Sequence, residues 1–107
     1  MRTGRLYFLI LALPFALVFG CKKDKPTCDG SDPNYDQNIK SILDANCATS
    51  NCHPSYNSYD GIESILDNGE FRKEVLEKQD MPRGKNLSND QLNTLQCWVE
   101  NGYKEAP

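Results

Sequence analysis

The 107-residue sequence predicts an all-α fold. Four segments after residue 34 place apolar residues three or four positions apart, which is the spacing of one buried helix face. No stretch alternates apolar and polar residues over a useful length, so we expect no half-buried strand. We find no internal repeat and no second core, and therefore expect one small domain over residues 34–107.

Residues 1–20 are predicted to be a lipoprotein signal peptide. Arg2 and Arg5 precede an apolar run over residues 6–19, which is shorter than the roughly 20 apolar residues that span a bilayer. The run ends in Gly20-Cys21 and resembles a bacterial lipobox, in which the cysteine is acylated before cleavage. This resemblance implies export and a lipid anchor in a bacterial membrane at Cys21. The alternative is ordinary secretion with Cys21 as a free thiol.

Residues 21–33 are interpreted as a lipid anchor followed by a polar tether. The stretch after Cys21 contains almost nothing to bury, and a flexible chain of this length reaches roughly 20 Å. The alternative is that the later part of this stretch packs on the domain through Cys28.

The first two helices are expected over residues 35–46 and 59–67. Ser58 is a suitable N-cap for the second helix, and Gly69 lies just past its end. The apolar positions that define the two buried faces are Ile39, Ile42 and Leu43, then Ile62, Ile65 and Leu66.

The third helix is expected over residues 70–78, and the fourth begins at a capping box formed by Ser88 and Gln91. Gly102 is expected to end the fourth helix. Cys97 points roughly away from the apolar face of that helix, which suits a thiol that meets a covering segment. The buried faces are defined by Phe71, Val75 and Leu76, then by Leu92, Leu95 and Val99.

Size and charge limit the function. Removal of residues 1–20 takes away two arginines and leaves ten basic against fifteen acidic residues, a net charge of about −5. This charge argues against nucleic acid as a partner. A core in a domain of this size contributes about 3–5 kcal/mol and usually needs a further covalent or cofactor link.

The strongest functional signal is the stretch Cys47-Ala48-Thr49-Ser50-Asn51-Cys52-His53. Two cysteines followed directly by a histidine attach haem covalently, because each thiol adds to a vinyl group and the histidine binds the iron. The usual spacing between the cysteines is two residues. The four residues found here are small or polar and can bulge outward. His53 is the only histidine, and Met81 is the only methionine left after removal of the leader.

The five cysteines can all be assigned. Cys21 is assigned to lipid, and Cys47 and Cys52 are assigned to haem. Cys28 and Cys97 remain, and they could form one disulfide in the oxidising compartment outside the inner membrane.

These residues resemble the small class I cytochrome c domain of exported bacterial lipoproteins over residues 34–104. The resemblance implies a fold of about four helices wrapped around one covalent haem c, with thioether bonds at Cys47 and Cys52. It also implies His53 and Met81 as the axial ligands of the iron. Pro54 replaces the small residue that usually follows the histidine in this family. The matching order is a helix, then Cys47-x4-Cys52-His53, then Asp80-Met81-Pro82, Leu87-Ser88 and Trp98-Val99-Glu100-Asn101-Gly102.

The sequence therefore predicts a lipid-anchored monohaem c-type cytochrome domain that carries single electrons outside the inner membrane, on the periplasmic or cell-surface side. Its expected partners are redox proteins. We expect no enzyme activity and no small-molecule substrate, because two protein ligands would fill the iron. The single histidine also leaves no general base for hydrolysis.

Four alternatives remain open. Cys47 and Cys52 could form a plain disulfide, or they could bind zinc with His53 by recruiting Cys28 or Cys97. Met81 could be a core residue, which would leave a five-coordinate iron that senses gas or reacts with peroxide. The whole domain could be a haem-free, disulfide-stapled module on the cell surface that binds a protein or a glycan.

Overall fold

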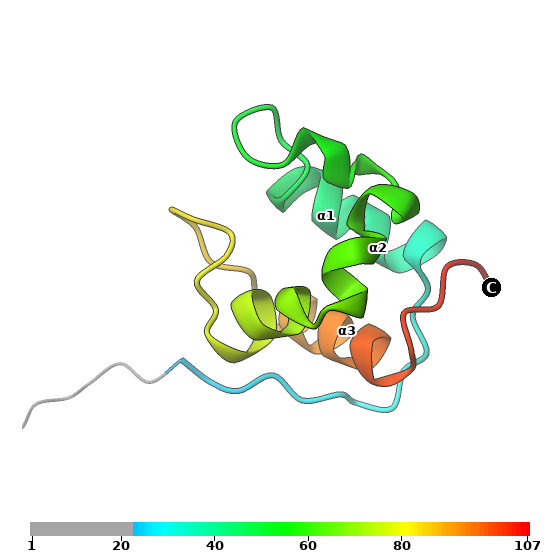
Figure 1. Ribbon diagram of the computed structural model, residues 1–107. Helices are drawn as coiled ribbons and strands as arrows, with labels where there is room; N and C mark the ends of the chain where they lie inside the picture. Colours follow the sequence, from blue (N-terminus) through cyan, green and yellow to red (C-terminus); the bar gives the residue numbers. More distant parts are fainter. Residues whose placement is uncertain (1–22) are drawn as a thin grey trace, which may run out of the picture.

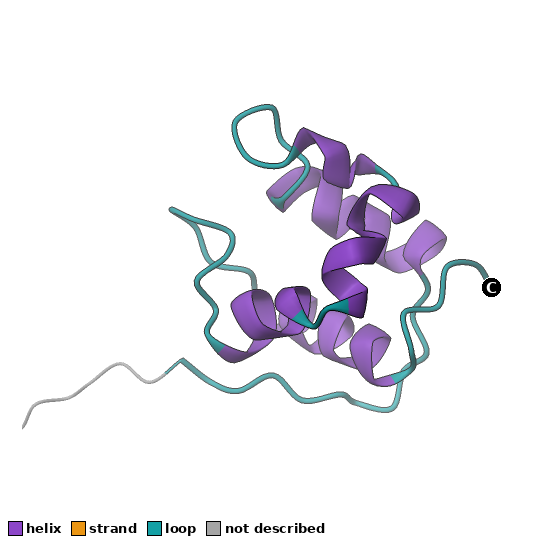
Figure 2. Ribbon diagram, viewed as in Figure 1, coloured by secondary structure: helices purple, strands orange, loops and turns teal. Residues whose placement is uncertain are grey.

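The computed structural model describes residues 23–107, so the predicted signal peptide and Cys21 lie outside the described residues. The described residues form helices and loops without strands (Figure 2), which confirms the all-α class. Within the same residues, no helix combines the length and hydropathy that a membrane span requires. The elements are the π-helical turn η1 (Tyr35–Ile39), α1 (Lys40–Asn46), the 3-10 turn η2 (Pro54–Asn57), α2 (Tyr59–Asp67), the π-helical segment η3 (Arg72–Glu77) and α3 (Asn89–Glu100).

The helix predicted over residues 35–46 is present, but its first part is wider than an α-helix. The Ile39 amide donates to the carbonyl of Asn34, five residues back, at 3.2 Å. The first amides of a helix lack partners within the helix. Here the amides of Tyr35 and Asp36 donate to the carbonyls of Lys104 and Glu105, at 2.8 and 3.0 Å. The C-terminal tail is thereby fixed across the start of this helix.

The helix predicted over residues 59–67 is confirmed, and the turn η2 in front of it was not predicted. Ser58 caps α2 as expected, because its hydroxyl accepts from the Gly61 amide at 3.1 Å. Gly61 also lies against η2: a Cβ atom at this position would be 1.9 Å from the Ser55 carbonyl oxygen. The close packing of α2 on η2 therefore depends on a residue without a side chain.

We expect Gly61→Ala to lower the thermal unfolding midpoint. A Gly-to-Ala change inside a helix normally gains up to about 1 kcal/mol from helix propensity. Here we expect a net loss of about 1–3 kcal/mol, because the new methyl group displaces the backbone of η2. Circular dichroism of Gly61→Ala, wild type and the exposed control Glu63→Ala tests this expectation. A midpoint at or above that of wild type would show that η2 moves away at no cost.

The fourth predicted helix is confirmed at both ends. Ser88 and Gln91 form the capping box, with hydrogen bonds of 3.0 and 3.1 Å between each side chain and the backbone of the other residue. At the far end, the Tyr103 amide donates to the Trp98 carbonyl at 2.9 Å, and the Gly102 amide donates to the Val99 carbonyl at 3.2 Å. Gly102 has a φ of +85°, which this type of helix ending requires.

Trp98 of α3 is the centre of the core and is fully buried. Its ring meets those of Phe71 and Tyr103 edge to face, with centroids 6.0 and 5.4 Å away, and lies 6.3 Å from the ring of Tyr35. Its Nε1 donates to the carbonyl of Lys104 at 3.0 Å. One side chain thus connects the first helix, the third predicted helix and the C-terminal tail.

Residues 23–33 are not a free tether, so the predicted polar tether is wrong for this segment. The segment runs along α3 (Figure 1), and Cys28 forms a disulfide with Cys97 of that helix. The Thr27 amide donates to Asn93 Oδ1 at 3.0 Å, and Asp32 pairs with Lys104 at 2.6 Å. The alternative, in which the later part of this stretch packs on the domain through Cys28, is therefore confirmed.

Candidate cofactor site

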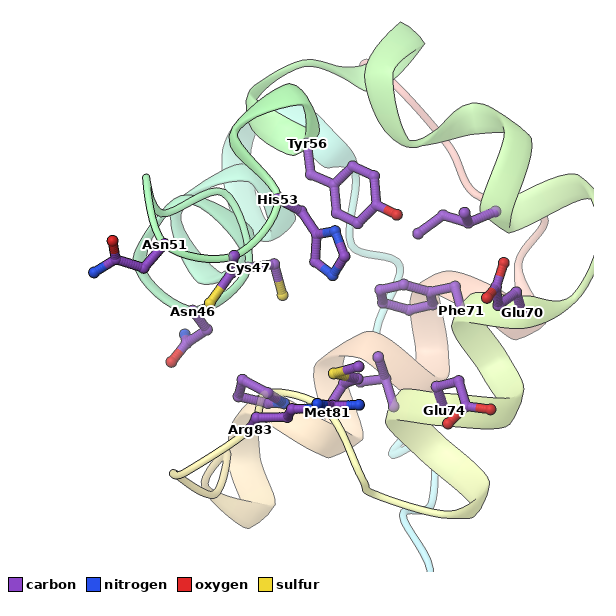
Figure 3. Close-up of a pocket in the computed structure, with 14 residues that line it drawn as sticks. Asn46, Cys47, Asn51, His53, Tyr56, Glu70, Phe71, Glu74, Met81 and Arg83 are labelled. Carbon is purple, nitrogen blue, oxygen red and sulfur yellow. The ribbon is translucent and has the colours of Figure 1, made fainter.

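Four residues selected from the sequence, Cys47, Cys52, His53 and Met81, line one cavity of about 370 Å³. This volume lies within the range of cofactor and small-molecule sites. Figure 3 shows His53 on one side of the cavity and Met81 on the opposite side. The structure therefore brings together all four residues that the sequence assigned to haem.

The loop over residues 47–53 closes on itself in spite of its long spacing. Cys47 ends α1, where its amide donates to the Leu43 carbonyl at 2.7 Å. The His53 amide donates back to the Cys47 carbonyl at 3.1 Å. The backbones of these two residues are thus adjacent, and the loop between them projects outward from the domain (Figure 1), although Asn51 and Cys52 also line the cavity. This is the outward bulge that the sequence led us to expect.

Cys47 and Cys52 are both free cysteines in the structure, whereas Cys28 and Cys97 are bonded to each other. Burial raises the pKa of the Cys47 thiol, and the nearby charge of Lys85 offsets only part of this effect. Burial therefore favours the neutral thiol of Cys47 over the thiolate. Cys52 is exposed. The plain Cys47–Cys52 disulfide is not the arrangement found here.

His53 lies against Tyr56, a residue that was not predicted to belong to the site. The two rings are stacked, with centroids 4.5 Å apart and planes inclined by 15°. Pro54 begins the turn η2, and the Tyr56 amide donates to the His53 carbonyl at 2.9 Å. Pro54 is thus the start of the turn that carries the Tyr56 ring back onto the imidazole. An aromatic residue three positions after the histidine was the available signal.

Met81 is half-buried at the margin of the core, so its side chain both packs and faces the cavity. Its amide and that of Asp80 donate to the carbonyl of Glu74, at 3.3 and 3.0 Å. Further along the same loop, Lys85 Nζ donates to the carbonyl of Ala45 at 2.8 Å. That carbonyl lies in the last turn of α1, where a cation is favourable. The Met81 loop is therefore fixed between η3 and the end of α1.

The remaining wall combines apolar side chains with a charged rim. Apolar surface is supplied by Ile65 of α2, by Phe71 at the start of η3 and by Val75 of η3. Glu74 forms an ion pair with Lys78 at 3.1 Å. Burial raises the pKa of Tyr56, and the charge of Glu70 adds to this effect. The other polar lining residues are Asn46, Asn51 and Arg83.

The zinc alternative lacks the ligands it needs. Within residues 23–107, one group of three His, Cys, Asp or Glu ligand atoms comes close enough to hold an ion, and it consists of Cys28, Asp29 and Cys97. Its two cysteines are joined in the disulfide. They are therefore not free to complete a site with Cys47, Cys52 and His53.

Comparison of the chain with protein-family models, with curated proteins and with solved structures found no match.

Proposed function

We propose that this chain is a lipid-anchored monohaem c-type cytochrome domain with a cytochrome c-like fold of about four helices, which carries single electrons outside the inner membrane. The observation that supports this function most directly is the convergence of Cys47, Cys52, His53 and Met81 on one cavity. These residues come from two separate loops, and His53 in the first loop is 28 positions before Met81 in the second.

The residues present fit haem c. Cys47 and Cys52 would hold the porphyrin through two thioether bonds, and His53 and Met81 would supply the protein ligands of the iron. When bound, haem supplies the exchange of one electron at its iron. A thioether ligand stabilises the ferrous state and favours a relatively high potential.

The chain's own residues prepare the cavity for this role. Ile65, Phe71 and Val75 give one wall of the cavity an apolar surface, and apolar surroundings contribute to the control of a redox potential. Tyr56 restricts the orientation of the His53 ring through the stacked contact. If His53 and Met81 both bind the iron, they would leave no open position for a substrate, so the partners we propose are redox proteins and no enzyme activity is assigned.

Haem staining of a denaturing gel tests the proposal. We expect a stained band for the full chain produced in a host with intact cytochrome maturation, because a covalent cofactor survives denaturation. The double variant Cys47→Ala/Cys52→Ala should lose the stain completely. The matched control Cys28→Ala/Cys97→Ala removes the other two described cysteines and should keep the stain per amount of protein.

The control remains informative even if its fold is weakened, because the stain is read after denaturation. A colourless wild-type band would reject the cytochrome function and favour the haem-free binding module on the cell surface. Equal staining of Cys47→Ala/Cys52→Ala would show that the cofactor is attached elsewhere.

A further inference from the structure

The N-terminal segment is hydrogen-bonded to the loop that carries Met81, although the two are far apart in sequence. Gln79 Nε2 donates to the carbonyl of Asp24 at 2.8 Å. In return, Lys23 Nζ donates to the carbonyl of Gln79. Both the side chain and the backbone of Gln79 are thus engaged by the N-terminal segment.

Gln79 has an unusual backbone conformation at the point where the chain leaves η3. Its φ is +53°, in the left-handed region that residues with a side chain seldom adopt. The next two amides, of Asp80 and Met81, then donate to the carbonyl of Glu74. A residue persists in this region when the surrounding contacts determine its conformation. The hydrogen bond that Lys23 donates to Gln79 and the one that Gln79 donates to Asp24 are such contacts.

The segment that holds Gln79 is itself fixed to the core. Cys28 is bonded to Cys97, which is fully buried in α3. The neighbouring Thr27 amide donates to Asn93 on the same helix. Only three residues separate Asp24 from Cys28. The contact at Gln79 is therefore made by a segment that is attached to the domain close by.

We infer that Gln79 is a positioning residue that keeps Met81 at the cavity for ligation of the haem iron. The inference rests on the proposed function, since it concerns the thioether ligand. Gln79 acts through the backbone turn before Met81, and the N-terminal segment holds that turn in place.

The test compares Gln79→Ala with wild type in the full, haem-loaded chain. We expect a weaker long-wavelength absorption band, which marks sulfur ligation to ferric haem. We also expect azide to bind about fivefold more tightly, the factor that corresponds to one lost hydrogen bond of ordinary strength. Met81→Ala provides the reference for complete loss of the band.

Asn101→Ala is the matched control. Asn101 Nδ2 donates to the carbonyl of Ser31 at 3.1 Å, so it holds the same segment on the other side of the disulfide. We expect this variant to keep the wild-type band and azide affinity. Unchanged band and affinity in Gln79→Ala would overturn the inference, and so would an equal change in Asn101→Ala.

Hydrogen exchange in the cofactor-free chain gives a readout that does not need haem. We expect the amides of Asp80 and Met81 to exchange about fivefold faster in Gln79→Ala, again the factor for one hydrogen bond, and at the wild-type rate in Asn101→Ala. Unchanged exchange in Gln79→Ala would overturn the inference. A colourless wild type would instead reject the proposed function, and exchange would then decide alone whether Gln79 holds this loop.

Discussion

Replacing Cys28 and Cys97 by alanine is expected to remove about half of the free energy of unfolding of the cofactor-free domain. The disulfide closes a loop of 69 residues in sequence separation. In the chain-entropy model, a loop of this length stabilises the folded state by about 4 kcal/mol. That contribution is comparable to the whole core stability of about 3–5 kcal/mol expected for so small a domain.

Urea unfolding followed by circular dichroism measures this loss. Cys47→Ala/Cys52→Ala is the matched control, because it removes two cysteines without breaking a bond. We expect its urea midpoint to stay close to that of wild type, whereas the midpoint of Cys28→Ala/Cys97→Ala should fall to about half the wild-type urea concentration. Equal midpoints for the two double variants would show that the disulfide contributes nothing to folding.

Trp98→Ala is expected to cost about 3–5 kcal/mol, the usual range for deleting a large aromatic side chain from a core. The side chain is fully buried and contacts Tyr35, Phe71 and Tyr103. Its loss also leaves the carbonyl of Lys104 without the indole donor. The helical turn η1, the start of η3 and the C-terminal tail would therefore lose the side chain that all three contact.

Thermal unfolding followed by circular dichroism is the appropriate measurement, because Trp98 is the only tryptophan and its fluorescence disappears in the variant. Trp98→Phe is the matched control, since it keeps an aromatic ring but loses the Nε1 hydrogen bond. We expect a smaller loss for it than for Trp98→Ala. Identical midpoints for the two variants would assign the stabilisation to the hydrogen bond rather than to packing.

The helices were predictable because their signals are local. Ser58 and Ser88 are N-caps that accept from the amide three residues further on. At the other end of α3, the hydrogen bonds around Gly102 join residues at most five positions apart. The turn η2 was not predicted, because it depends on the fit of its Ser55 carbonyl against Gly61 of the next helix. Such a contact leaves no periodic pattern in the sequence.

The site was predictable to a similar degree. Cys47, Cys52, His53 and Met81 were selected as a set because their residue types are chemically distinctive. Phe71 and Val75 were predicted only as members of a buried face, since spacing does not reveal which edge of that face borders a cavity. The contact of the N-terminal segment with Gln79 was not predicted, because it joins residues 55 positions apart.

The attachment of residues 23–33 to α3 changes how the domain would sit at a bilayer. As a flexible chain, this stretch would let the domain explore a hemisphere of roughly 20 Å radius. With the stretch fastened to the helix, only Cys21 and Lys22 separate the described domain from the acyl chains that we propose. The domain would then lie close to the lipid headgroups in a restricted set of orientations. A redox partner would therefore have to approach it along the membrane surface.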